Sequence, residues 1–471
     1  MMKGHFFVVF VSFFSILLRI SPIFGQNDHA FFIKDIYDYS LTKAKCYERL
    51  HYLSEEIGGR MTGTENAANA VSYTAKELEF KGTKVWKQSC MVPSWVRKEE
   101  AKVQVKLNDG SIRDLHATAL GNSIGTGGKQ ISGEIIEVFS LDTLGILGEK
   151  SLKDKIVFFN RPMDPTQVHT GWAYGGAVDQ RVNGAARSSL YGAKAALIRS
   201  MTTLIDSIPH TGVSSYGDVE VKIPAIAIST MDAEWLSAQL STQKVIKASL
   251  SADCYMEDDK ESHNVIAEIK GSEFPNEIIL VGGHLDSWDL GGGAHDDGAG
   301  CVHSIQVFET LLALNYKPKR TLRCVMFMNE ENGLAGGKRY AEVSDSLGEF
   351  HLAAIESDMG GFTPRGFGCS ANDEVFKTYL RNFQTFSTYL EPYDLYLKSG
   401  GGGADINPLK PQGGLLIGFK PDSQRYFDLH HTKLDRIDKV NKRELELGAA
   451  AITSLVYLLD QFGLKGVPTE E

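Results

Sequence analysis

The chain has 471 residues. A chain of this length is usually too long for a single hydrophobic core, so we expect two domains. Hydrophobic residues make up 42% of it and charged residues 23%, which is ordinary for a globular protein. The formal net charge of −10 comes without a basic block, and this argues against nucleic acid as a partner.

The N-terminal segment has the pattern of a targeting sequence. Lys3 precedes an apolar run from Phe6 to Leu18, and Arg19 ends that run before it reaches the roughly 20 residues that a membrane span requires. We therefore expect residues 1–25 to be a secretory signal peptide and the mature protein to be secreted or periplasmic, without membrane attachment. Retention of the segment as a short anchor is the alternative.

The six cysteines are even in number and could pair in an oxidising compartment. One hypothesis is a disulfide between Cys90 and Cys254, which flank a segment of different sequence pattern, but sequence does not set connectivity. No Asn-x-Ser/Thr sequon occurs in the chain, which removes N-glycosylation.

Two patterns follow each other in the first half of the mature chain. Residues 31–82 have helical apolar spacing, interrupted by the turn-like sequence GGRMTGTENA. From about residue 93 to 256, short alternating runs and turns such as Asn108-Asp109-Gly110 replace that spacing and predict an inserted domain rich in β structure. Within it, residues 171–184 are expected to form a loose loop, either overhanging the site or lying elsewhere on the surface.

Strand-like and helical patterns alternate after residue 257, which favours an α/β sandwich. We expect helices over residues 298–316, 333–343 and 444–462, and we interpret His303 in the first of them as structural rather than as a ligand. The glycine-rich segment 398–409 predicts a mobile loop beside the pocket.

Three uninterrupted apolar runs end in side chains that can bind metal. They lead into His284 with Asp286, into Glu330 with Glu331, and into Asp358. Such runs suit strands buried on both faces of a parallel sheet, and ligands collect at the carboxyl edge of these sheets. Charged groups after buried strands need compensation. With a further histidine far downstream, this mixture of imidazole and carboxylate predicts a zinc site that leaves a position for water.

The same residues resemble the pattern of the M28 zinc peptidases. That pattern is His-x-Asp, an Asp in an Asp-Asp-Gly turn, Glu-Glu, Asp, and a final His followed by Thr or Ser. All parts occur here in order, as His284, Asp296, Glu330 with Glu331, Asp358 and His431. The resemblance implies a zinc-exopeptidase α/β/α sandwich with a mostly parallel central sheet. It also implies a catalytic domain formed by residues 26–92 and 257–471, with a protease-associated-like domain inserted over residues 93–256.

The resemblance further implies a role for each residue of the site. Asp296 is expected to bridge two zinc ions and to precede a cis peptide bond to Asp297. One zinc ion is completed by Glu331 and His431, the other by His284 and Asp358. Glu330 is expected to be the general base. Asp286, on the same face of the strand as His284, is expected to fix its imidazole.

Two adjacent histidines, His430 and His431, are candidates for the last metal ligand. Side chains of neighbouring residues diverge on an extended segment, so only one is expected to reach the metal. Thr432 and Asp435 complete a His-Thr-x-x-Asp phrase that resembles the family's and indicates His431. Some relatives carry a Tyr in place of His430 as oxyanion donor, which leaves His430 and Tyr426 as the candidates here.

The implied function is a secreted dinuclear zinc exopeptidase that hydrolyses dipeptides or short peptides through metal-activated water. An aminopeptidase, a single-zinc glutaminyl cyclase-like enzyme and a non-catalytic receptor or binding module are the alternatives. An aminopeptidase needs acids for the free α-amine, whereas a carboxypeptidase needs cations or N–H groups for the α-carboxylate. Arg181, Arg365 and Lys398 are available for that role. Assembly into a homodimer is left open.

Overall fold

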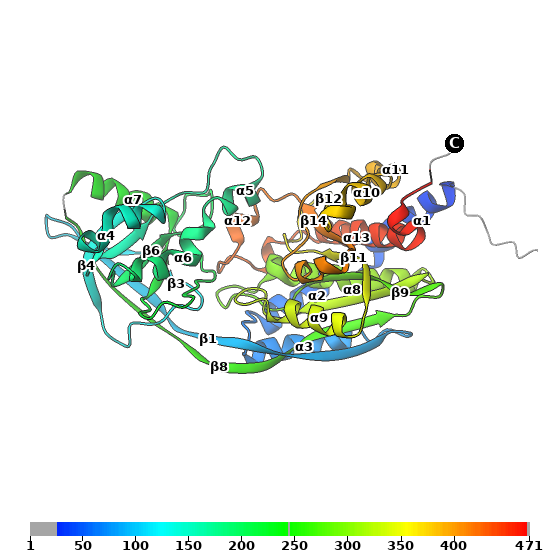
Figure 1. The fold of residues 1–471 in the computed structure, drawn as a ribbon, viewed down its shortest axis with the longest axis horizontal. Coiled ribbons are helices and arrows are strands. Elements are labelled where there is room, and N and C mark those ends of the chain that lie inside the picture. Colours follow the sequence, from blue (N-terminus) through cyan, green and yellow to red (C-terminus); the bar gives the residue numbers. More distant parts are fainter. Residues whose placement is uncertain (1–25, 244, 469–471) are drawn as a thin grey trace, which may run out of the picture.

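The computed structural model describes residues 26–243 and 245–468, so the expected signal peptide lies outside the described residues. The protein has two lobes joined by two long strands, β1 (Lys84–Lys106) and β8 (Lys247–Ile269), as Figure 1 shows. These strands pair antiparallel from Lys84 opposite Glu268 to Lys106 opposite Lys247. We call residues 26–92 and 257–468 the first lobe and residues 93–256 the second lobe. The boundaries expected at 93 and 256 thus fall inside continuous strands rather than in linkers.

The first lobe is built on a mixed sheet with the strand order β13-β12-β14-β11-β9-β10-β8. The bounds of these strands are β9 (Phe274–His284), β10 (Arg320–Phe327), β11 (Phe350–Glu356), β12 (Pro364–Ser370), β13 (Tyr396–Ser399) and β14 (Leu415–Pro421). The four central strands, β14, β11, β9 and β10, run parallel, while β12 and β8 pair antiparallel with them on either side. The mostly parallel central sheet predicted from the sequence is therefore confirmed.

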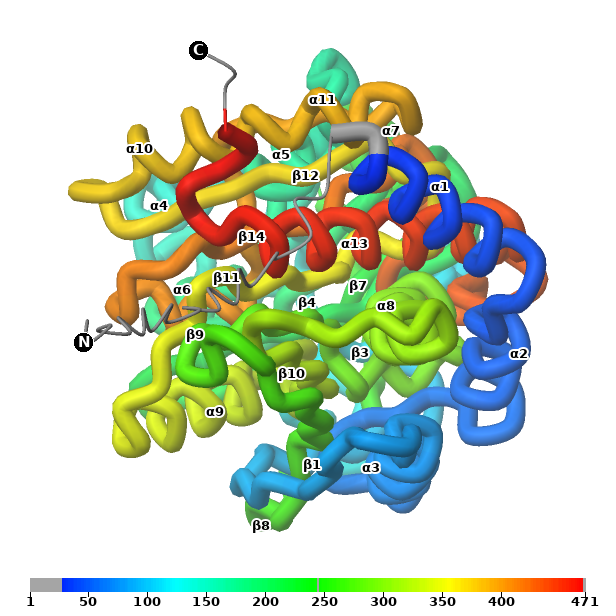
Figure 2. The backbone as a smooth tube through the Cα atoms, turned by 90° about the vertical axis from the view of Figure 1, so that its right-hand side faces the viewer, coloured from blue at the N-terminus to red at the C-terminus, as the bar shows by residue number. Residues whose placement is uncertain are grey.

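Helices cover both faces of this sheet. Along β9, Ile279 and Val281 enter one hydrophobic core, whereas Leu280 enters a second core on the opposite face. The first core contains residues of α1 (Gln26–Lys43), α2 (Cys46–His51), α8 (Ala299–Ala313) and α13 (Lys442–Phe462), and the second contains residues of α9 (Ala335–Ser346). Figure 2 shows α2 and α8 across the sheet from α9. This is the expected α/β/α sandwich.

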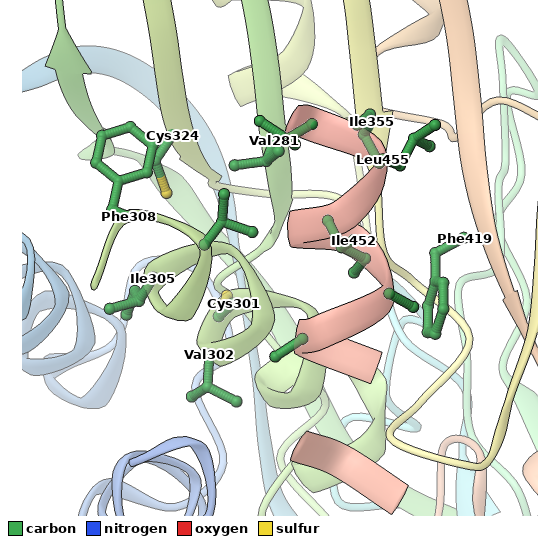
Figure 3. Packing of buried hydrophobic residues seen from close by; sticks show 14 of the residues in the cluster. Val281, Cys301, Val302, Ile305, Phe308, Cys324, Ile355, Phe419, Ile452 and Leu455 are labelled. Atoms are coloured by element: carbon green, nitrogen blue, oxygen red, sulfur yellow. The ribbon is translucent and has the colours of Figure 1, made fainter. Parts of the chain in front are cut away.

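Helix α13 closes the first core. In Figure 3, Ile452 and Leu455 of this helix lie beside Val281 and Ile355 of the sheet. In the described part of the chain, the segment Lys442–Lys465 is the one helical stretch long and apolar enough to cross a membrane, and 78% of its apolar window is buried inside the protein. Its apolar character is therefore explained by packing in the core.

The predicted helices near the N-terminus are present. They are α1, α2, a π-helical turn η1 (Tyr52–Ile57) and α3 (Glu65–Glu77), where the Thr64 side chain caps α3 by accepting a hydrogen bond from the Ala67 N–H. The remaining helical segments of this lobe are η2 (Ala294–Gly298), α10 (Asp373–Gln384), α11 (Ser387–Leu390), η3 (Glu391–Tyr393), η4 (Asn407–Gln412), α12 (Tyr426–Leu429), η5 (Ile437–Lys439) and η6 (Gly463–Lys465). The loop predicted over residues 398–409 is confirmed only for residues 400–406, because Lys398 and Ser399 end β13 and residues 407–409 begin η4.

The second lobe contains more helix than the sequence suggests. Its strands are β2 (Ile112–Leu115), β3 (Ala117–Ala119), β4 (Ile131–Val138), β5 (Ile156–Phe159), β6 (Ala195–Arg199) and β7 (Ala225–Ile228), and its helices are α4 (Asp142–Leu152), α5 (Thr170–Gly175), α6 (Val178–Ser189) and α7 (Thr230–Thr242). Strands β4 to β7 are parallel neighbours, so this lobe is an α/β unit with a predicted β1–β2 hairpin attached.

The loop predicted over residues 171–184 is wrong, because this segment forms α5 and the start of α6. Gly184 in this segment serves close packing rather than a loop. A Cβ at Gly184 would lie 2.9 Å from the Phe159 ring of β5, so glycine lets the helix approach the sheet.

The disulfide hypothesis is not supported either, since all six cysteines are free and buried. On the ladder between β1 and β8, Cys90 lies opposite Ser262 and Cys254 lies opposite Arg97. The two sulfur atoms therefore belong to different rungs and cannot be bonded without moving the strands.

The Trp288 side chain packs the first lobe against the second. It lies on the loop after β9 in the first lobe, is 3% exposed and packs into the hydrophobic core of the second lobe. Gly121 of the second lobe makes room for it, because a Cβ there would lie 1.9 Å from the indole ring. We expect Trp288→Ala to lower the free energy of unfolding by about 3–5 kcal/mol. Urea-induced unfolding measures this, and Trp172→Ala, at a tryptophan that is 70% exposed, is the control with a change below about 1 kcal/mol.

Candidate metal centre

The three strand ends singled out in the sequence meet at the carboxyl edge of the sheet. Strand β9 ends at His284, the turn after β10 carries Glu330 and Glu331, and β11 leads into Asp358. His284 and Glu331 are buried, while Glu330 and Asp358 are partly exposed. The expected convergence at this edge is therefore present.

Two clusters of donor atoms form there, and Asp296 belongs to both. His284 Nε2 lies 3.3 Å from Asp296 Oδ1 and 3.5 Å from Asp358 Oδ1. His431 Nε2 lies 3.3 Å from Asp296 Oδ2 and 3.2 Å from Glu331 Oε2. The peptide bond after Asp296 is cis, as expected. Each predicted ligand thus lies in the cluster to which the sequence assigned it.

The donor atoms fit metal ions. Buried polar atoms nearly always have a hydrogen-bond partner, but His284 Nε2, Asp296 Oδ2 and Glu331 Oε1 have none in the described part of the chain. Tetrahedral zinc bonds of about 2.0–2.1 Å place neighbouring donor atoms about 3.3 Å apart. The separations between the clustered atoms, 3.2 to 3.5 Å, agree with that value.

The electrostatics of the clusters also favour a cation. Burial opposes protonation of His284, yet the nearby carboxylates of Asp296 and Asp358 raise the pKa of its imidazole well above the usual value. Burial, reinforced by the neighbouring Asp296, raises the pKa of Glu331 to about 7. Three carboxyl groups around two imidazoles carry an excess of negative charge that bound cations would balance.

Asp286 orients the site in a different way from the one expected. Its main-chain carbonyl, not its carboxylate, accepts the hydrogen bond from His284 Nδ1, at 2.9 Å. The carboxylate instead accepts the main-chain N–H groups of Asn329, Glu330 and Glu331 at 2.7, 3.0 and 3.2 Å. Asp286 therefore holds both the imidazole and the turn that carries the two glutamates.

The second lobe supports the other imidazole. The Thr211 N–H donates to the His431 carbonyl at 3.0 Å, and the Thr211 carbonyl lies 3.3 Å from His431 Nδ1. His210 Nδ1 donates to the His430 carbonyl at 2.8 Å. A carbonyl acceptor at Nδ1 leaves Nε2 of His431 free to bind metal. The sequence contained no signal for these contacts from His210 and Thr211.

The expectation that His430 and His431 diverge is wrong. Their rings are stacked with centroids 3.4 Å apart, and His430 Nε2 also approaches Asp296 Oδ2, at 3.6 Å. Side-chain alternation assumes an extended backbone, whereas His431 has a φ of 63°, in the left-handed region. This conformation turns both side chains to the same side. His431 contacts two acids of the clusters and His430 only one.

A cavity of about 780 Å³ opens in front of the clusters. Its walls include Glu330, Asp358, Tyr426 and His430 from the first lobe, and Tyr174 and Arg181 from the second. Arg365 and Lys398 line a separate adjoining cavity of about 550 Å³. Of the three cations that the sequence offered for a carboxylate, Arg181 is the one beside the metal ligands.

Burial shifts the pKa values of the remaining predicted site residues. Burial raises the pKa of the Glu330 carboxyl well above its usual value, and no imidazole in the described residues forms an ion pair with it. Burial also raises the pKa of Tyr426, which keeps its phenol neutral and able to donate a proton in a hydrogen bond. Burial lowers the pKa of His430 well below its usual value.

Sequence reasoning missed three residues near the centre. Tyr174, on α5, lies in the segment predicted to be a loop. Glu356 and Asp405 are buried, and their carboxyl groups keep oxygen atoms without hydrogen-bond partners. The run of glycines before Asp405 was a signal, because a Cβ at Gly403 would lie 1.9 Å from the Glu356 carboxyl carbon. Glycine is needed there for close packing against that acid.

Comparison with known proteins gives three agreeing results. The profile of peptidase family M28 matches residues 264–456. Carboxypeptidase Q of Xenopus laevis is 34% identical over 442 residues, which are 93% of this chain and 91% of that protein, and the Homo sapiens protein is 32% identical over 425 residues, 89% and 86% of the two chains. The crystal structure of a peptidase M28 precursor from Shewanella amazonensis superposes with a TM-score of 0.85 at 31% identity, covering 95% of this chain and 98% of the other.

The chain belongs to peptidase family M28. It is accordingly an enzyme, a metallopeptidase, and the matched range contains all five clustered candidate ligands and Glu330. BSAP, a zinc aminopeptidase from Bacillus subtilis, superposes with a TM-score of 0.62 at 20% identity over 88% of this chain and 94% of its own, a likeness of fold. The M28 profile begins in β8 and ends in α13, so the second lobe lies outside it.

Proposed function

We propose that this M28 peptidase is a secreted dinuclear zinc exopeptidase of the carboxypeptidase Q type, which hydrolyses dipeptides or short peptides. The observation that carries the proposal is the position of Asp296. Its two carboxylate oxygens each lie 3.3 Å from the Nε2 atom of a different imidazole, one of His284 and one of His431. A carboxylate shared in this way is suited to bridging two metal ions.

The residues divide the work of hydrolysis. His284 and Asp358 would hold one zinc ion, and Glu331 and His431 the other. Zinc, when bound, polarises the scissile carbonyl and lowers the pKa of the attacking water. Glu330 accepts a proton from this water and passes it to the leaving amine. Tyr426 and His430, both facing the cavity, are the candidate hydrogen-bond donors to the carbonyl oxygen.

The alternatives are less well supported. A single-zinc cyclase-like enzyme has no need of two complete donor sets, and a receptor or binding module has no need of the free Glu330 carboxyl. The name carboxypeptidase Q of the full-length relatives favours removal of the C-terminal residue over an aminopeptidase activity. The apolar N-terminal run supports secretion.

Elemental analysis tests the proposal. We expect the purified protein to contain close to two zinc ions per chain, because both donor sets are complete. A single tightly bound zinc would favour the cyclase-like alternative. A protein that binds no zinc even after zinc is added would favour the receptor or binding module. The same preparation, given unblocked, N-blocked and C-blocked dipeptides, should leave the C-blocked ones intact; their cleavage would identify an aminopeptidase.

A further inference from the structure

Arg181 is a buried cation without an acidic partner. It lies on α6, is 4% exposed and contributes to the wall of the 780 Å³ cavity. It forms no ion pair with any described residue, and its Nε has no hydrogen-bond acceptor there. A buried guanidinium without a counter-charge is costly, so a group that compensates its charge is expected.

The other buried arginines of the described chain have acidic or main-chain carbonyl partners, although the Nε of Arg199, like that of Arg181, lacks an acceptor. Arg49, Arg199, Arg320 and Arg323 form ion pairs with glutamates, and Arg60 donates to the main-chain carbonyls of Leu285, Gly292 and Gly293. Arg181 instead lies 5.5 Å from the centre of the Tyr174 ring and 3.4 Å, through Nη1, from His431 Nδ1. Neither neighbour carries a negative charge.

His431 cannot serve as the acceptor for Arg181. When Nε2 of His431 is a metal ligand, Nδ1 carries the proton and faces the Thr211 carbonyl at 3.3 Å. Gly212 closes the remaining side, because a Cβ there would lie 2.5 Å from Arg181 Nη1 and 2.6 Å from His431 Nδ1. The guanidinium is therefore held between main chain and imidazole. Apart from a hydrogen bond with the neutral Tyr174 hydroxyl, its remaining donors have only the cavity from which to find an acceptor.

We propose that Arg181 binds the C-terminal carboxylate of the substrate and so selects the last peptide bond for cleavage. The planar guanidinium fork matches a carboxylate, which it can bind through two hydrogen bonds. The inference rests on the proposed exopeptidase function and adds the residue that sets its direction.

Geometry limits which bond is cut. One imidazole ring, that of His431, separates the guanidinium from the Asp296 and Glu331 carboxylates. Successive residues of a peptide are about 3.8 Å apart, so a carboxylate held by Arg181 leaves the bond one residue away beside the clusters. Arg365 is a poorer candidate, since it already pairs with Asp422 at 2.8 Å and lies in the adjoining cavity.

The kinetic test compares a dipeptide with its C-terminal amide. For Arg181→Met we expect kcat/KM on the free acid to fall about 10²-fold, mainly through KM, with the amide unaffected. Arg181→Lys should recover part of the loss, because it restores the charge without the fork. Lys222→Met removes an exposed cation from the same cavity wall and should leave kcat/KM unchanged for both the free acid and the amide. An equal loss on acid and amide, or no loss on the acid, would overturn the proposal.

A binding measurement separates this inference from the proposed function. Zinc-loaded Glu330→Gln protein should bind the free dipeptide more tightly than its amide by titration calorimetry, and adding Arg181→Met should remove that preference. This result does not require hydrolysis, so it stands even if the wild type proves not to cleave peptides. An unchanged preference in the double variant would refute the role of Arg181. Removal of an uncompensated charge should leave thermal stability unchanged or higher, whereas a purely structural arginine would lower it.

Discussion

Glu330→Gln should lower kcat by about 10²–10⁴-fold and leave the zinc content unchanged. The amide has nearly the same shape as the carboxylate but cannot accept the proton of the attacking water. The carboxyl group of Glu330 lies outside both donor clusters, while its main-chain N–H stays bound to Asp286. Steady-state kinetics and elemental analysis on the same sample measure the two quantities together.

Glu331→Gln is the matched control, since it makes the same change one residue away. Glu331 Oε2 lies 3.2 Å from His431 Nε2, so this variant should lose zinc from one site. A Glu330→Gln enzyme with activity near that of the wild type would show that another group accepts the proton.

His431→Ala should weaken zinc binding at the site shared with Glu331 by more than about 100-fold. Losing only a hydrogen-bond partner of a ligand typically costs about 10–100-fold in affinity, and loss of the ligand itself should exceed that. Activity should fall with the zinc. Equilibrium dialysis against zinc, followed by elemental analysis, gives the affinity.

His430→Ala provides the comparison at the neighbouring ring. His430 approaches only Asp296, at 3.6 Å, and we expect its variant to keep both metals and to slow catalysis. Because the rings are stacked, the thermal unfolding temperature should be measured for both variants to show that the loop is intact. Zinc lost from the His430 variant but retained by the His431 variant would exchange the two assignments.

The sequence predicted the sheet of the first lobe, and the clustering of the candidate ligands at its edge, well because the constraints there are local. Apolar runs buried on both faces leave little choice but strands, and the acids that end them have to share one sheet edge. His284, Asp296, Glu331 and Asp358 follow from this argument together with the motif. The positions of these groups depend mainly on the strands that carry them.

What the sequence did not predict depends on contacts between distant segments. The helix over residues 178–189 was hidden by glycines that permit packing rather than turns. The stacking of His430 on His431 required a left-handed backbone at a residue where that conformation is uncommon. Arg181 was one of three available cations, and only the three-dimensional arrangement put it beside His431.

The two strands that join the lobes impose an order on folding. β1 is synthesised before the second lobe, whereas its partner β8 follows it, so most of β1, beyond the short end that pairs with β2, lacks its partner until nearly 270 residues have been made. Pairing of segments this far apart is slow, and an unpaired strand edge can associate with other chains in the meantime. The contacts of His210 and Thr211 with His430 and His431 can form only after those two histidines, which come much later in the chain, have been synthesised. The candidate metal centre is therefore among the last parts to form, and a chain truncated before residue 430 would lack both a candidate ligand, His431, and the helix α13 that closes the first core.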